Sequence, residues 1–238
     1  MGKTSLKQRI LQYAAAQSYH TVNLNLNQLN QEQLLEVRPF FRFFYANVTQ
    51  QINLENRLDH YWDDDIGAIV SSTLYMENYI LPTVETALVL AIDDVHRLFD
   101  SSAVAQCFLP LLRSWYEEGR DGGIWQKLRL VVAHSTEIYV PLNVHQSPFN
   151  IGVALRLPDF TAPQVDQLAA LHGLNWQSGQ ESQRLIRCLG GHPYRIRLAL
   201  YHLARDEITL TDLLRTAAAR GGIYQGYLRS LLVLINTQ

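Results

Sequence analysis

The chain has 238 residues, of which 18% are charged, and a formal net charge of −2. This length is enough for one large domain or two small ones. Because the net charge is near zero, the overall electrostatic field of the protein would not attract nucleic acid or a membrane surface. No apolar run approaches the roughly 20 residues that span a bilayer, and Cys107 and Cys188 lie in apolar contexts that favour reduced thiols in a cytoplasmic setting.

Helices and strands are expected to alternate over the first half of the chain. Leu6, Ile10 and Ala14 recur at helical spacing and predict a helix from Thr4 to about Gln17. Residues 21–26 alternate apolar and polar, which is typical of a strand with one wetter face. Two further helices are predicted, one over 66–80 and, before it, one that carries the aromatic residues Phe40, Phe41, Phe43, Phe44 and Tyr45.

The middle of the chain continues this α/β pattern. The apolar run at 88–93 predicts a buried parallel strand. A helix with an apolar face follows, formed by Phe108, Leu111, Leu112 and Trp115, and Pro110 is expected to start or kink it. We then expect a turn at 119–123, a strand at 128–133 and a last, shorter strand at 151–157.

After Pro158 the pattern becomes wholly helical. Helices are predicted at 161–172, 181–189, 192–205 and 209–220. The sequence therefore predicts an α/β core over residues 1–160, followed by a small helical lid over residues 161–238.

Two short motifs indicate a nucleotide site. Gly2, Lys3 and Thr4 match the second half of a phosphate-binding loop, Gly-x4-Gly-Lys-Ser/Thr, which alone is a weak signal. The signal gains weight because the apolar run at 88–94 ends in two carboxylates, Asp93 and Asp94. This is the pattern of a buried strand that carries a metal-holding acid at its carboxyl end. Lys3 would then bind the outer phosphates, Thr4 and Asp93 would hold Mg²⁺, and Asp94 would be the catalytic acid that positions water. The simpler interpretation is a solvated lysine and an Asp pair that ends a strand.

A family resemblance extends over nearly the whole chain. It is carried by residues 1–6 (MGKTSL), 88–99, 109–115, 124–139, 143–150 and 190–193. These stretches resemble the AAA-like domain of bacterial, largely cyanobacterial, signal-transduction ATPases of the STAND type. The resemblance implies an additional-strand P-loop NTPase core with ATP and Mg²⁺ as cofactors, acting as a nucleotide-operated switch with protein partners in signalling. It leaves formation of a homo-oligomer open.

The resemblance also implies roles for particular residues. Besides the motifs above, Ser5 lies in the phosphate-binding stretch, His134 and Ser135 occupy the place of a polar sensor of the terminal phosphate, and His192 and Pro193 belong to a Gly-x-Pro lid turn near the adenine. Relatives commonly carry Glu where this chain has Asp94. Because the shorter carboxylate is displaced, and displacements of about 1 Å can cost about a hundredfold in rate, we expect weak hydrolysis or none. His134 can instead be an exposed loop histidine, and the lid turn a plain connection between helices.

Only the second half of the phosphate-binding loop is present, and the strand that should precede it is absent from the sequence. We therefore expect either a start upstream of Met1 or a fragment whose missing strand comes from elsewhere. The alternative function is a degenerate ATPase fragment that serves as an interaction or structural module without nucleotide. A third, weaker hypothesis is nucleic-acid binding by the basic stretch 184–229, which has eight Arg against three acids.

Overall fold

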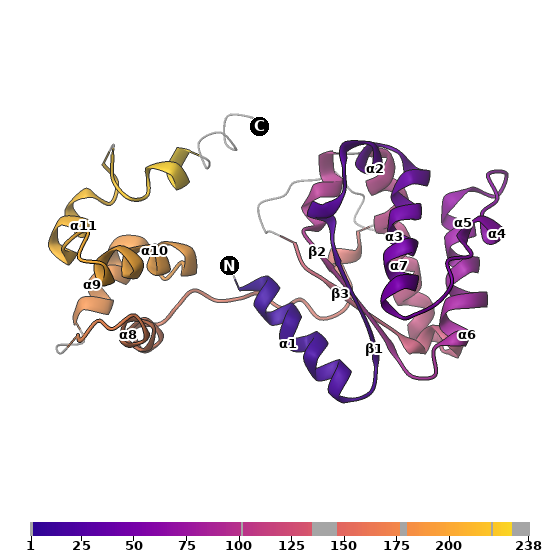
Figure 1. The fold of residues 1–238 in the computed structure, drawn as a ribbon, viewed down its shortest axis with the longest axis horizontal. Coiled ribbons are helices and arrows are strands. Elements are labelled where there is room, and N and C mark those ends of the chain that lie inside the picture. Colours follow the sequence, from indigo (N-terminus) through magenta and orange to yellow (C-terminus); the bar gives the residue numbers. More distant parts are fainter. Residues whose placement is uncertain (1, 101, 135–146, 177–179, 220, 230–238) are drawn as a thin grey trace. The chain divides into compact units, whose positions relative to one another are not determined.

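The computed structural model describes residues 2–100, 102–134, 147–176, 180–219 and 221–229 (Figure 1). The chain divides into two compact units, the first over Lys3–Leu155 and the second from Arg156 onward together with residues 1–2. Each unit has its own hydrophobic core.

The first unit is an α/β structure. Its elements are α1 (Lys3–Ala16), β1 (His20–Asn25), η1 (Leu26–Gln28), α2 (Gln31–Leu35), α3 (Val37–Gln51), α4 (Leu58–Tyr61), α5 (Gly67–Tyr75), η2 (Met76–Ile80), α6 (Leu81–Thr83), β2 (Leu88–Asp93), η3 (Val95–Asp100), α7 (Ser102–Asp121), η4 (Gly123–Lys127), β3 (Leu128–Val132) and η5 (Pro148–Asn150).

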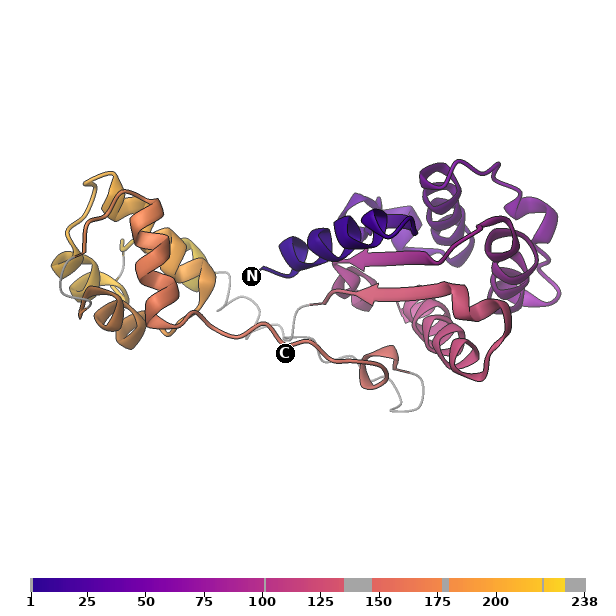
Figure 2. The same ribbon diagram turned by 90° about the horizontal axis from the view of Figure 1, so that it is seen from below.

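The sheet of this unit has three parallel strands in the order β1-β2-β3, so that β2 is central. Helix α1 covers one face, while α3, α5 and α7 lie on the other (Figures 1 and 2). Because side chains alternate between the faces of a strand, Leu88, Leu90 and Ile92 join the large aromatic core under α3 and α7. Val89 and Ala91 point to the opposite face and pack with α1.

The aromatic core explains why α3 and α7 hold the sheet. Phe40, Phe41, Phe44 and Tyr45 of α3 are fully buried, and Phe108 of α7 packs among them. Edge-to-face ring pairs of this kind add to the burial of large apolar surfaces. The predicted aromatic helix and the helix predicted at 66–80 are thus confirmed as α3 and the continuous run α5–η2.

Two expectations for this unit were wrong, and so was one of the two alternatives for Pro110, that it starts the helix. Helix α7 starts at Ser102, so Pro110 lies inside the helix and does not start it. The same helix extends to Asp121, which confines the turn to Gly122 and Gly123, both with positive φ. Residues 151–157 form no strand.

The strand is missing because the segment has no partner strand among the described residues. Val153 and Leu155 are 87% and 68% exposed, and the segment pairs with none of the described strands. Without ladder hydrogen bonds to a neighbour, an alternating pattern cannot form a strand in a sheet.

The second unit is helical, with α8 (Ala162–Leu171), α9 (Gln180–Leu189), α10 (Pro193–Ala204) and α11 (Leu210–Thr216). Its core contains Val165, Leu185, Leu200 and Leu213. The predicted helices are confirmed, except that α11 ends at Thr216, short of the expected end at Arg220, which lies outside the described residues. Among the described residues of both units, no helix combines the length and apolarity needed to cross a membrane.

Candidate functional site

The alternation of side chains along β2 determines which face of the sheet Asp93 lies on. Val89, Ala91 and Asp93 share one face of the strand because side chains alternate with a period of two, and that face lies against α1. Asp93 is therefore carried to the N-terminal turn of α1, at the carboxyl end of the strand. Crevices at the carboxyl ends of parallel strands are the usual ligand sites of α/β sheets.

The Asp93 carboxylate is held from three sides. The Thr4 hydroxyl donates to Asp93 Oδ2 at 3.0 Å, Lys7 Nζ lies 2.8 Å from the same oxygen, and the Asp94 backbone N–H donates to Oδ1 at 3.0 Å. Burial by itself raises the pKa of Asp93, but the hydrogen bond and charge of Lys7, together with Thr4 and the Asp94 N–H, outweigh burial and lower that pKa below its ordinary value.

Lys7 is a site residue that sequence reasoning missed. The buried residues of α1 are Lys7, Leu11 and Ala14, whereas the apolar pattern had indicated Leu6, Ile10 and Ala14. Leu6 and Ile10 are only half-buried. Spacing could have found Lys7, since a residue three positions after Thr4 lies on the same face of a helix.

Asp94 lies beside Asp93 in a left-handed backbone conformation, with φ of 58°. This conformation is uncommon for a residue other than glycine and tends to occur at functional sites. The Asn27 amide donates to Asp94 Oδ2 at 2.6 Å, and His96 Nδ1 is 3.9 Å from Oδ1. Asn27 was also missed, because its contact depends on the pairing of β1 with β2, which places η1 next to the end of β2.

The other phosphate-loop residues lie at the start of α1. Gly2 has φ of 96° and precedes the helix, Lys3 is half-buried, and Ser5 is exposed. Within the described ranges the Lys3 ammonium makes no ion pair, so that Lys7 and not Lys3 is the cation at Asp93. The first N–H groups of a helix have no partner within the helix and favour an anion, and α1 has no acid in its first turn.

His134 follows β3 and its ring lies 4.4 Å from that of Phe149. The end of β3 adjoins the site, since the Val95 N–H donates to the Ala133 carbonyl just after Asp94. Ser135 lies outside the described residues.

His192 and Pro193 belong to the second unit. Gly190, with φ of 63°, ends α9, His192 is the N-cap of α10 and Pro193 is its first residue, as expected for a helix end and start. Gly191 is required for a separate reason, because a Cβ there would collide with the backbone of Phe160, whose N–H donates to the Gly191 carbonyl at 2.7 Å.

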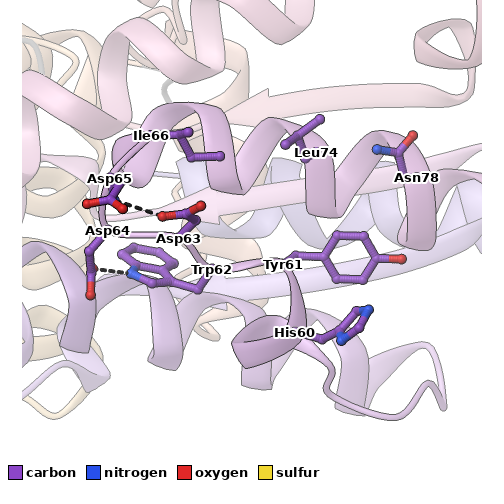
Figure 3. A pocket seen from close by; sticks show the side chains of 9 residues that line it. All are labelled: His60, Tyr61, Trp62, Asp63, Asp64, Asp65, Ile66, Leu74 and Asn78. Atoms are coloured by element: carbon purple, nitrogen blue, oxygen red, sulfur yellow. Dashed lines mark hydrogen bonds between the residues drawn. The ribbon is translucent and has the colours of Figure 1, made fainter.

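A concave region lies on α4, α5, η2 and the loop between α4 and α5. Figure 3 shows this open pocket of about 640 Å³, lined by His60, Tyr61, Trp62, Asp63, Asp64, Asp65, Ile66, Leu74 and Asn78. Two of its carboxylates have local partners: Asp64 accepts from Trp62 Nε1 at 2.6 Å and from Arg38 at 3.0 Å, and Asp63 accepts from the Asp65 backbone N–H at 2.8 Å. Across the described part of the chain, no group of three or more His, Cys, Asp or Glu is arranged to hold a metal ion.

The oxygen atoms of Thr4 and Asp93 are of the chemical type that binds a magnesium ion. Mg²⁺ prefers hard oxygen ligands and is commonly bound by one or two protein oxygens, with water and substrate phosphate completing its shell. The Thr4 hydroxyl and the Asp93 carboxylate are such oxygens, and they are in contact. The Lys7 ammonium at the same carboxylate oxygen already supplies a positive charge there.

Comparison with known proteins identifies the family of the chain. Searches of curated proteins and of solved structures find nothing similar to this chain. The family described as AAA-like domain matches residues 1–238, the entire length. This match agrees with the α/β fold and its three parallel strands, and the chain belongs to the AAA-like domain family, within the P-loop NTPases.

Proposed function

We propose that this chain is an ATP- and Mg²⁺-binding switch module of a STAND-type signalling ATPase, with weak or impaired hydrolysis. Residues 1–160 would form the nucleotide-binding core and residues 161–238 the lid. The observation that carries the proposal is the hydrogen bond from Thr4 to Asp93. It joins two motif residues that are 89 positions apart in the chain, and it does so at the N-terminus of a helix.

The geometry supports separate roles for the residues of the core. The N–H groups of the first turn of α1 and Lys3, which makes no ion pair with any of the described residues, would bind the phosphates, because both favour negative charge. Thr4 and Asp93 would hold Mg²⁺, which supplies charge neutralisation on the phosphates when bound. The β1-β2-β3 order supports an additional-strand P-loop sheet.

Asp94 is proposed as the residue that positions the attacking water. Its carboxylate is partly exposed, and the Asn27 amide and His96 lie beside it. Asp94 is one methylene shorter than Glu, and its carboxylate already accepts a hydrogen bond from the Asn27 amide. Both features place it poorly for positioning water, which supports slow hydrolysis.

The lid is proposed to report the nucleotide state through His192 and Pro193, and His134 with Ser135 is proposed as the sensor of the terminal phosphate. The close packing of the turn supports the first role, since no side chain fits at Gly191 and the Phe160 N–H donates to the Gly191 carbonyl. Protein partners in signalling belong to the same proposal.

Thermal unfolding with ATP and MgCl₂ tests the proposal. A ligand at a hundred times its dissociation constant adds about 2.7 kcal/mol, which for a chain of this size raises Tm by roughly 5 °C or more. Lys3→Ala should abolish the shift. Arg9→Ala is the matched control, because it removes an exposed cation from the same helix and should leave the shift intact.

One observation favours the second candidate, an interaction or structural module without nucleotide. The ion pair with Lys7 neutralises Asp93 without any bound metal. A folded wild-type chain whose Tm does not respond to millimolar ATP, with or without MgCl₂, would support this candidate and refute the first.

A further inference from the structure

Lys7 occupies a position at which the fold calls for an apolar side chain. It lies on the buried stripe of α1 with Leu11 and Ala14, which pack on Val89 and Ala91 of β2. The side chains of Lys7 and Asp93 are each only 3% exposed. A lysine is almost never buried unless it is paired, so this position is explained by its partner and not by packing.

Two donors meet at one oxygen of the Asp93 carboxylate. Asp93 Oδ2 accepts the hydrogen bond from Thr4 and is 2.8 Å from Lys7 Nζ. The remaining oxygen, Oδ1, accepts from the Asp94 N–H. The next acid along the chain does not share this cation, since Asp94 is directed to Asn27 and His96. Asp93 and Lys7 therefore balance one charge against one.

We propose that Lys7 is a built-in cation that competes with Mg²⁺ for Asp93, so that this chain binds a nucleoside triphosphate with little dependence on divalent metal. This inference rests on the proposed function. A divalent ion beside Asp93 would lie within a few ångströms of the ammonium, and like charges at that distance repel strongly in a buried site. Mg²⁺ can bind at Asp93 only when the flexible lysine side chain leaves it.

The first test needs no nucleotide. Thermal unfolding is compared in EDTA and in millimolar MgCl₂ at matched ionic strength. The wild-type Tm should change by less than about 1 °C, whereas Lys7→Met, which leaves Asp93 without a cation, should gain on the order of 4 °C with Mg²⁺. Met is chosen because it is unbranched and favours helix.

Two further variants control the first test. Lys7→Met/Asp93→Asn lacks the carboxylate and should not respond to Mg²⁺. Arg9→Met removes an exposed cation from the same helix and should behave as the wild type. Should Lys7→Met unfold in EDTA, recovery of its folded signal with MgCl₂ but not with KCl supports the proposal, and failure to recover with either overturns it.

The second test measures binding of a fluorescent ATP analogue. The wild-type affinity should differ by less than about threefold between Mg²⁺ and EDTA, while Lys7→Met should bind at least about tenfold more weakly in EDTA than in Mg²⁺. The two tests separate the claims. If no variant binds the analogue but the Mg²⁺ responses hold, the proposed function fails and the role of Lys7 stands. If Mg²⁺ stabilises the wild type as much as Lys7→Met, or stabilises neither, the role of Lys7 is refuted.

Discussion

Breaking the Lys7–Asp93 ion pair from either side should destabilise the first unit by several kcal/mol. At 2.8 Å the gross attraction of two unit charges is about 6 kcal/mol at an effective dielectric of 20. Most of that attraction offsets desolvation, but removing one partner leaves the other charge buried and uncompensated, which typically costs about 3–5 kcal/mol. We therefore expect losses in this range for Lys7→Met and for Asp93→Asn.

The double variant Lys7→Met/Asp93→Asn should regain most of this loss. No charge is left buried, because both charged residues are replaced by uncharged ones. Met can pack on Leu11 and Ala14, and the Asn side-chain carbonyl can still accept the Thr4 hydrogen bond. Replacement of a buried pair by uncharged residues of similar volume is often neutral or stabilising. We expect a coupling energy of about 3 kcal/mol or more, measured by urea unfolding in EDTA and followed by circular dichroism.

The pH dependence adds an independent check on the same pair. Because the pKa of Asp93 is lowered in the folded state, the folded protein gains stability that is fully present above the unfolded value of about 3.9 and is lost as the pH falls through the folded value. The wild type should therefore lose stability more steeply than the double variant below about pH 4. Single variants that cost less than about 1 kcal/mol each and add without coupling would refute the buried ion pair.

Three further predictions concern other parts of the chain. Burial raises the pKa of Tyr75 from 10.0 to about 12, so the folded state loses stability as the pH rises from 10 towards 12. Tyr75→Phe should flatten this alkaline loss, and an unchanged slope would contradict the reasoning. Gly191→Ala should cost the second unit about 2 kcal/mol or more in urea unfolding because its Cβ would meet the Phe160 backbone, whereas Gly226→Ala, which has open space, should cost little. Val153→Lys should change the unfolding free energy by less than about 0.5 kcal/mol because Val153 is 87% exposed; a larger loss would show that 151–157 pairs in solution.

Much of the fold could be predicted from periodicity. The strands predicted at 21–26, 88–93 and 128–133 are observed at 20–25, 88–93 and 128–132. Alternation indicated the first and a continuous apolar run the second, and helical spacing indicated the helix that precedes β1. The predicted strand at 151–157 failed because a period of two identifies a face but not a neighbour. Pro110 misled in a different way, since α7 has enough buried apolar contacts, from Phe108 to Trp115, to continue through a proline.

The candidate site was only partly predictable. Thr4 and Asp93 could be paired because the two motifs imply each other, and the structure places them in contact. Lys7 was missed because Leu6 was taken for the buried residue of the first turn, and a charged residue is not counted in an apolar stripe. Asn27 was missed because its contact with Asp94 arises from strand pairing between distant segments, which no local pattern encodes.

The register of β2 places the Asp93 carboxylate on a buried face, where it needs a neighbouring cation. If β2 were displaced by one residue, Asp93 would point into the aromatic core under α3 and α7, and the apolar side chains would face α1. In the observed register Asp93 is nonetheless buried, on a face that is otherwise lined by Val89, Ala91 and Leu11. A carboxylate in such surroundings must be neutralised by a partner. Lys7 on α1 provides that charge within the fold itself, so the first unit can be stable without metal, and any metal at this site must first compete with a residue of the same chain.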